Sequence, residues 1–201
     1  MVRRAVVALL GRVGWAPPGT DPAAWRAALA EDVIDLLATL NMVQPAIAVS
    51  AADRTLAEAV AWPGMPIYEL ADGSVNAALA AAAEDGYEQA AIIAGDAPDV
   101  PGLILGKLLR PLTSRTVAVA AASPDGTGLF GLAARLPVPD WLPEIDLDST
   151  SARRVRAAAP RPVEVALTPS WRRLRGPADL ATLDPAVSGW DHTRALLRPD
   201  G

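Results

Sequence analysis

Residues 90–101 read AAIIAGDAPDVP, and this stretch decides the fold class. Its first five residues, Ala90 to Ala94, form an unbroken apolar run between helix-like flanks, which is typical of a strand buried on both faces of a sheet. Asp96 and Asp99 follow in a loop that two prolines stiffen. The stretch therefore predicts a central strand of a mostly parallel sheet, with two carboxylates beyond its carboxyl end.

Apolar, β-prone runs alternate with amphipathic Ala- and Leu-rich runs on both sides of this stretch. Further strands are expected at residues 6–10, 46–50, 66–70, 117–121, 128–133 and 163–167. Helices are expected at residues 22–40, 52–60, 74–83, 102–109, 149–158, 177–183 and 190–197, the first with Asp21 as its N-cap. This alternation predicts one domain over residues 1–201 with an α/β fold, a three-layer sandwich around a mostly parallel, mixed sheet.

Sheets of this kind bind ligands in the loops beyond the carboxyl ends of their strands. Here those loops are residues 11–20, 71–76, 95–101 and 123–128. Asp96 and Asp99 lie in the third loop, and their carboxylate oxygens suit Mg²⁺ or Mn²⁺, hard cations that often bridge to phosphates. A plainer interpretation stays open, in which Asp99 caps the next helix and Asp96 is a solvated turn residue.

The composition limits the classes of function. Hydrophobic residues make up 51% of the 201, enough for a sizeable core, and the net charge of −5 argues against a nucleic-acid or anionic-membrane partner. The absence of cysteine excludes disulfides, thiolate catalysis and cysteine zinc sites, and His192 is the only histidine. No apolar run reaches the length of a membrane span, and residues 5–10 are too short for a signal peptide, so a cytoplasmic location is expected.

Four segments in chain order resemble motifs of one group of proteins. Residues 95–100, GDAPDV, resemble a strand-end motif, and Asn76-Ala-Ala-Leu resembles a Leu-Asn-x-Ala-Leu stretch. Residues 123–132, SPDGTGLFGL, resemble an Asp-Gly-Gly-Tyr-x-Leu-x-Gly-Leu stretch, and residues 176–183, GPADLATL, resemble the tail of an Asp-x-Asp-Thr-Pro-x-Asp-Leu motif. The group is the GT-A-fold superfamily of nucleotide-diphospho-sugar transferases. The resemblance is to its uncharacterised glycosyltransferase-like branch and to the guanylyltransferases that make coenzyme F420 precursors.

The resemblance implies transfer of a nucleotidyl or glycosyl group from a nucleoside triphosphate or nucleotide-sugar to a small acceptor. It implies catalytic roles for Asp96 and Asp125 and a site for Mg²⁺ or Mn²⁺ at Asp96 and Asp99. The nucleotide-binding residues would be Gly11, Arg12, Asn76, Asp96, Arg173 and Arg175. The acceptor-binding residues would be Gly126, Thr127, Asp146, Asp148 and Ser149. Residues 125–126 could instead form only a turn, Asp148 or Ser149 could cap a helix, and a homodimer is left open.

Two departures from the pattern bear on activity. The family's first loop holds several cations that bind phosphates, whereas GRVGWAPPGTD, residues 11–21, has only Arg12. The late Asp-x-Asp pair is Arg173-Leu-Arg175 here, which reverses the charge. Either metal-dependent chemistry has been lost, leaving a degenerate homologue that binds a nucleotide or protein partner, or guanidinium groups take over the cation's role against phosphates. Both interpretations remain open, as does a third, in which Arg173 and Arg175 belong to an ordinary basic surface strand.

Overall fold

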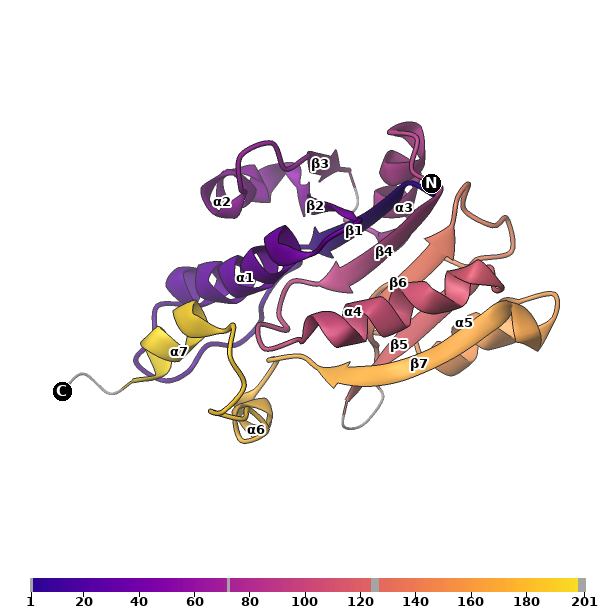
Figure 1. Cartoon of the computed structure of the whole chain (residues 1–201). Helices are drawn as coiled ribbons and strands as arrows, with labels where there is room; N and C mark the ends of the chain where they lie inside the picture. The colour runs from indigo at the N-terminus through magenta and orange to yellow at the C-terminus, as the bar shows by residue number, and fades with distance from the viewer. Residues whose placement is uncertain (1, 72, 124–126, 199–201) are drawn as a thin grey trace.

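The computed structural model describes residues 2–71, 73–123 and 127–198. Within them, seven strands form one sheet in the order β3-β2-β1-β4-β6-β5-β7 (Figure 1). The strands are β1 (Arg4–Leu9), β2 (Gln44–Ser50), β3 (Ile67–Leu70), β4 (Gln89–Ala94), β5 (Val117–Ser123), β6 (Leu129–Arg135) and β7 (Val165–Arg172). The predicted strand at residues 90–94 is therefore confirmed as the central one.

Four strand pairs are parallel and two are antiparallel. β4 pairs in parallel with β1 and antiparallel with β6, which also runs antiparallel to β5. The physical reason is the connection between β5 and β6, residues 124–128, which is too short for the crossover that parallel neighbours need. The expected mostly parallel, mixed sheet is confirmed.

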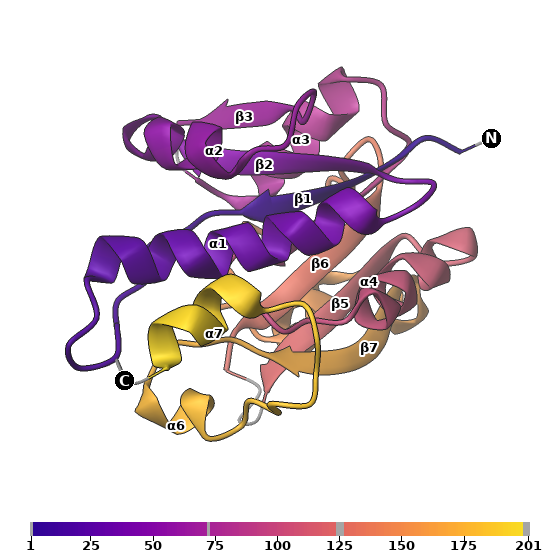
Figure 2. The same cartoon turned by 60° about the vertical axis from the view of Figure 1, so that its left-hand side comes forward.

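Helices cover both faces of the sheet (Figures 1 and 2). They are α1 (Pro22–Thr39), α2 (Arg54–Val60), α3 (Val75–Glu84), α4 (Gly102–Leu109), α5 (Ala152–Ala158), α6 (Pro177–Leu180) and α7 (Asp191–Leu197), with 3-10 turns η1 (Ala51–Asp53), η2 (Arg110–Thr113) and η3 (Pro162–Glu164). Alternate β4 side chains pack against the helices on opposite faces of the sheet. Ile93 packs in the core under α1, α2 and α4, and Ile92 in the core under α3 and α5. None of the helices in the described ranges is long and apolar enough to cross a membrane.

Local capping sets several helix starts. Asp21 Oδ2 accepts a hydrogen bond from the Ala24 amide at 2.8 Å, as predicted for the start of α1. The helix expected from residue 149 instead begins at Ala152, because the Ser151 hydroxyl accepts from the Arg154 amide and provides the cap. Neither Asp148 nor Ser149 caps α5, so that part of the prediction was wrong.

β7 is longer than its apolar run indicates, reaching Arg172 instead of Leu167. It is one of the two edge strands of the sheet, and its pairing with β5 continues past a register shift at Ala120–Ala122. An edge strand has only one neighbour to bury it, so backbone pairing can extend through polar residues that show no apolar pattern. The extension places Arg172 in the strand and Arg173 directly beyond its carboxyl end.

The C-terminal segment packs on α1 and on the first loop. Trp25, Leu29 and Leu174 form a small buried cluster, and Trp15 meets Trp25 edge-on with ring centroids 6.1 Å apart. α7 lies along α1 (Figure 2), where Asp32 accepts hydrogen bonds from the first amides of α7. Burial raises the pKa of Asp32, and these hydrogen bonds offset part of that rise. The loop before α1 therefore packs against α1 and against the C-terminal segment.

Candidate functional site

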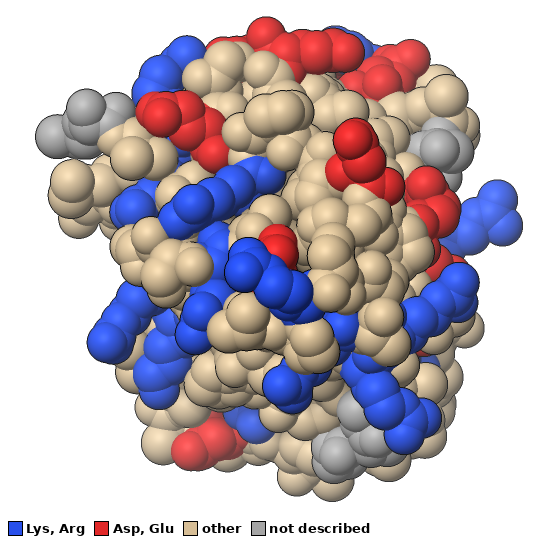
Figure 3. All heavy atoms as spheres, turned by 90° about the vertical axis from the view of Figure 1, so that its right-hand side faces the viewer, with Lys and Arg blue, Asp and Glu red and all other residues tan. Residues whose placement is uncertain are grey.

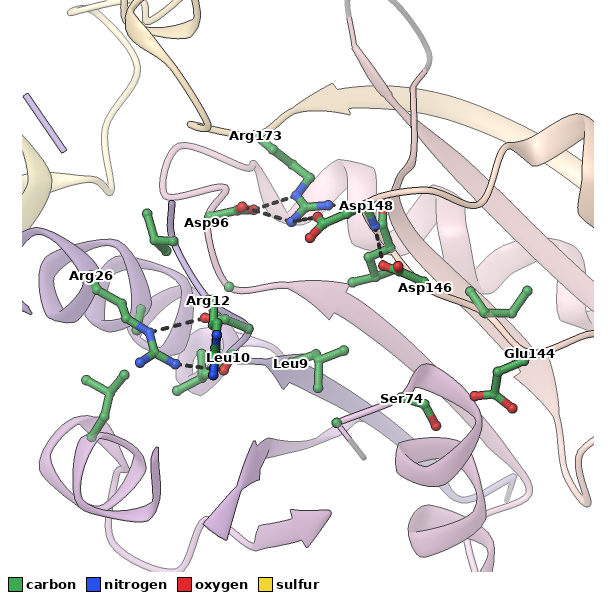
Figure 4. Close-up of a pocket in the computed structure, with 18 residues that line it drawn as sticks. Leu9, Leu10, Arg12, Arg26, Ser74, Asp96, Glu144, Asp146, Asp148 and Arg173 are labelled. Atoms are coloured by element: carbon green, nitrogen blue, oxygen red, sulfur yellow. Dashed lines mark hydrogen bonds and ion pairs between the residues drawn. The ribbon is translucent and has the colours of Figure 1, made fainter. Parts of the chain in front are cut away.

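A cavity of about 360 Å³ opens beyond the carboxyl ends of β1 and β4 (Figure 4). Its walls come from residues 9–13, 73–74, 95–96 and 144–148, with Arg26, Ala30, Leu56 and Arg173. The volume is in the range of small-molecule sites, and the position is where α/β sheets bind ligands. Three of the four loops chosen from the sequence contribute to it, and so do Asp146 and Asp148, which were expected on the acceptor side.

Gly95 brings the Asp96 loop against the end of β1. The Gly95 amide donates to the Leu9 carbonyl at 3.1 Å. A Cβ on Gly95 would lie 2.6 Å from Leu10 Cδ2 and 3.2 Å from the Leu9 oxygen, closer than packed atoms approach. A larger residue would therefore require the Leu10 side chain to move, so glycine favours this close approach of the Asp96 loop to β1.

Arg173 fills the space in front of Asp96 (Figure 4). Its Nε and Nη2 contact the two Asp96 carboxylate oxygens at 2.6 and 2.9 Å, and Nη2 also lies 2.8 Å from Asp148 Oδ1. Nη1 donates to the Leu129 and Leu147 carbonyls at 3.3 and 3.1 Å. These five contacts equal the number of N–H donors on a guanidinium, so the protein itself satisfies this group completely.

The charge of Arg173 is stabilised where it lies. Burial by itself would lower the pKa of its guanidinium, but the charges of Asp96 and Asp148 and their hydrogen bonds raise the pKa above its usual value. The side chains of Arg173 and Asp96 are 7% and 6% exposed, and they form a bidentate pair. Arg173 is therefore not a residue of a basic surface strand, and Asp96 is not a solvated turn residue.

Asp99 does not share this site. Its side chain is fully buried, accepts hydrogen bonds from Arg172 Nε at 2.6 Å and Trp171 Nε1 at 3.2 Å, and does not line the cavity. It does not cap α4 either, because the N-cap position is Pro101. The expectation that Asp96 and Asp99 hold one metal ion is not met by the geometry, since each carboxylate is bound to a different arginine.

The donor set at Asp96 does not fit a divalent cation. Both Asp96 oxygens are bound to a guanidinium, and a metal ion in contact with them would be repelled by the same positive charge. Across the described ranges, no group of three or more His, Asp or Glu residues is arranged to hold a metal ion. The charge reversal in the sequence therefore places the positive charge of Arg173 directly against the Asp96 carboxylate.

The first loop is fixed by Arg26 from α1. Arg26 donates to the Leu10 and Gly11 carbonyls at 3.2 and 3.1 Å and pairs with Asp53 at 2.6 Å. The hydrogen bond from Arg26 lowers the pKa of Asp53, and the charge of nearby Arg12 adds to the effect. Arg12 itself lines the cavity, is exposed, and forms no hydrogen bond or ion pair with any residue that the structure describes. It is therefore available to a ligand.

The loop at residues 143–150 forms the acidic wall. Asp146 and Asp148 line the cavity, and Asp146 accepts hydrogen bonds from the Asp148 amide and the Ser149 hydroxyl. Asn76 holds the loop from α3, because its amide donates to the Pro143 carbonyl and accepts from the Ile145 amide. Asn76 and Ser149 thus support the wall without lining it.

Two other expected site residues lie outside the cavity, and two more belong to residues that the structure does not describe. Arg175 is outside the cavity, and its Nη2 donates to the Thr127 carbonyl at 3.2 Å. Thr127 does not line the cavity either. Asp125 and Gly126, the expected catalytic and acceptor residues of that turn, lie outside the described residues.

Sequence reasoning missed two charged residues of the cavity, Arg26 and Glu144. Glu144, Asp146 and Asp148 alternate along a Pro- and Asp-rich loop, and this spacing was a usable signal for Glu144. Nothing in the sequence distinguishes Arg26 from other helix-surface arginines. Its position follows from how α1 packs beside the first loop.

The cavity is close to balanced in charge. Its described lining carries three arginines, Arg12, Arg26 and Arg173, and four carboxylates, Asp96, Glu144, Asp146 and Asp148. Other Lys and Arg side chains gather on the opposite end of the molecule, the face with the amino ends of the parallel strands (Figure 3). They therefore do not contribute contacts to the cavity.

No protein-family model matches the chain, and no curated protein matches its sequence. Solved structures share the fold. A candidate nucleotide-diphospho-sugar transferase from Desulfovibrio desulfuricans is 18% identical, with a TM-score of 0.68 over 98% of this chain and 97% of the other. A nucleotidyl transferase from Methanothermobacter is 15% identical, with a TM-score of 0.61 over 96% and 99%. A Mycobacterium tuberculosis protein in complex with manganese is 18% identical, with a TM-score of 0.55 over 98% and 99%. The chain has the fold of nucleotide-diphospho-sugar transferases.

Proposed function

We propose that the chain is a transferase-like protein that binds a nucleotide or nucleotide-sugar in this cavity and does so without a divalent cation at Asp96. The observation that carries the proposal is the complete set of contacts around Arg173, which binds a positively charged guanidinium to both oxygens of Asp96, where a metal would otherwise sit. The built-in guanidinium neutralises the carboxylate that a metal would otherwise neutralise.

A cation at the rim and an apolar wall of the cavity would bind the nucleotide. Arg12 is a free cation at the cavity rim and suits a phosphate, which arginine can hold by two parallel hydrogen bonds. Leu9, Leu10, Val13 and Leu56 give the same cavity an apolar side suited to a base. The fold supports the class of ligand, since the similar structures include nucleotidyl and nucleotide-sugar transferases.

Transfer would be slow or absent on this reading. Phosphoryl and glycosyl transfer from nucleotides depends on placing positive charge against the charge that develops on the phosphates. Here the buried guanidinium is already committed to Asp96 and Asp148. The degenerate, ligand-binding alternative is thus the one that the site geometry supports better.

Catalytic transfer is the second candidate, and one observation favours it. Glu144, Asp146 and Asp148 place three carboxylates on one wall of the cavity, where they could accept protons from a small acceptor. The M. tuberculosis protein with this fold is bound to manganese, so this second candidate includes a divalent metal that binds together with the nucleotide, although the donor set at Asp96 alone does not fit one. Asp125, Gly126 and Thr127 would then be part of the acceptor side, as the family resemblance implies.

Ligand binding with and without metal separates the two. The test is calorimetry with GTP, CTP and UDP-sugars, first in EDTA and then with Mg²⁺ or Mn²⁺. We expect at least one nucleotide to bind in EDTA, with an affinity that the metal changes by no more than about twofold, since both Asp96 oxygens are already paired with Arg173. Arg12→Ala should weaken that binding about tenfold or more, the usual worth of a hydrogen bond to a charged group.

Arg175→Ala is the matched control, because Arg175 is a half-buried arginine outside the cavity. It should bind like the parent. Metal-dependent binding with turnover of a labelled nucleotide would establish the transferase instead. No binding of any nucleotide in either condition would refute the proposal.

A further inference from the structure

Among the residues that the structure describes, Asp148 is the only exposed partner of the buried Arg173 guanidinium. Its side chain is 63% exposed, against 6% for Asp96, and the other two partners are the backbone carbonyls of Leu129 and Leu147. Four of the five contacts of the guanidinium are therefore made with buried partners. The fifth, from Nη2 to Asp148, can be exchanged without exposing the others.

The backbone beneath Asp148 is fixed, so that exchange needs only a side-chain rotation. The Leu147 carbonyl accepts from the Leu129 amide at 2.7 Å as well as from Arg173. Gly128, at φ 77°, lets the loop approach so closely that a Cβ there would lie 2.4 Å from the Leu147 oxygen. The Asp148 amide donates to Asp146 Oδ1 at 2.8 Å. The carboxylate can turn to solvent while the loop stays in place.

We propose that the Asp148 carboxylate occupies an anion subsite on Arg173 Nη2, and that a phosphate group of a ligand binds there by displacing it. Asp148 is then an internal competitor that keeps the guanidinium satisfied while the cavity is empty. The displaced carboxylate is hydrated at the rim, and the entering phosphate takes over the same N–H. Arg12 lines the same cavity and is free to contact the other oxygens of the ligand.

The chemistry of the subsite favours phosphate over a neutral group. Nη2 belongs to a guanidinium whose positive charge is delocalised over its three nitrogens, and it contacts two carboxylates, Asp96 and Asp148. A charged acceptor makes a hydrogen bond about twice as strong as a neutral one, so a neutral ligand atom would not displace a carboxylate. For the same reason, Asp148→Asn should be a weaker competitor, because its neutral amide oxygen has the same shape but accepts a weaker hydrogen bond from Arg173 Nη2.

The subsite deepens the proposed function, since it would hold one of the nucleotide's phosphates, but it is tested without a nucleotide. The probe is inorganic pyrophosphate in EDTA, titrated by calorimetry into the parent, Asp148→Asn and Glu144→Gln. Both variants remove one negative charge from the cavity rim, but only Asp148 contacts Arg173. We expect Asp148→Asn to bind pyrophosphate about five- to tenfold more tightly than the parent. Glu144→Gln should gain no more than about twofold, because water and salt screen exposed charges.

Three results would overturn the proposal. Equal gains in the two variants would mean that the cavity responds only to its overall charge. An unchanged or weaker affinity in Asp148→Asn would mean that Asp148 does not compete. Failure of all three proteins to bind pyrophosphate at millimolar concentration would mean that the anion subsite does not exist. Thermal unfolding of each variant checks that the fold is intact, which the exposure of both side chains predicts.

The same data separate this proposal from the broader one. Nucleotide binding with equal pyrophosphate gains in both variants would leave the proposed function standing and remove the subsite. Selective gain in Asp148→Asn with no nucleotide bound would keep the anion subsite and remove the nucleotide.

Discussion

Replacing Arg173 by Met should destabilise the protein more than any exposed substitution. Met has a similar length, but it leaves the Asp96 carboxylate buried, with its residue only 5% exposed, and it removes the side-chain donors from the Leu129 and Leu147 carbonyls. Removing one partner of a buried ion pair usually costs about 3–5 kcal/mol, because the remaining charge is uncompensated. For a chain of this length the melting temperature should fall by roughly 6–20 °C.

Urea unfolding of the parent, Arg173→Met, Asp96→Asn and the double variant measures the effect at neutral pH. The double variant should be at least about 1 kcal/mol more stable than Arg173→Met, because the amide replaces the unpaired charge. Arg12→Met is the matched control: Arg12 is exposed and makes no hydrogen bond within the described chain, so its loss should stay within about 0.5 kcal/mol.

Two outcomes would refute the reasoning. A loss below about 1 kcal/mol for Arg173→Met would show that the pair is solvated in solution. Strictly additive effects of Asp96→Asn and Arg173→Met would show that the two side chains do not interact.

Three further predictions concern the supports of the cavity. Asp53→Asn should lower the free energy of unfolding by roughly 1 kcal/mol at pH 7. Because Arg26 lowers the pKa of Asp53, this contribution is complete above the unfolded pKa of about 3.9 and is lost as the pH falls through the lowered folded pKa. The unfolding curves of the two proteins should therefore converge in acid, and a difference that grows in acid would contradict the assignment. Gly128→Ala should lose about 1–3 kcal/mol in urea unfolding, since its Cβ would meet the Leu147 oxygen at 2.4 Å, and a neutral result would show that the loop can move away. Leu174→Ala should lose about 2–5 kcal/mol by the same measurement, because the side chain is fully buried, and a loss under about 1 kcal/mol would mean that the cluster repacks.

Much of the architecture was predictable because its causes are local. The apolar run at residues 90–94 can be buried only between two layers, and it became the central strand β4. Asp21 before a proline marked the start of α1, since a cap is decided by residues within one helical turn. Where two such signals lay close together, as at Ser149 and Ser151, local reasoning chose the wrong one and began α5 three residues early.

The candidate site depended on contacts between distant residues. The sequence pointed to Asp96 and to the charge reversal at Arg173, but these residues are 77 positions apart. Their pairing arises because β4 and β7 run in the same direction, so that their carboxyl ends lie at the same end of the sheet. Asp99, three residues from Asp96, turns to a different arginine. Arg26 reaches the first loop only because α1 packs beside it.

The sequence by itself determined the fold class, the order of most elements and the presence of charged groups near a strand end. Those features follow from short-range periodicity and capping, which each segment carries in its own residues. The tertiary structure alone decided which charges face one another, that Arg173 satisfies Asp96, and that Arg12 stays free. A side chain's partner is set by the packing of whole elements and by the need to satisfy every buried charge, and neither can be read from a segment in isolation.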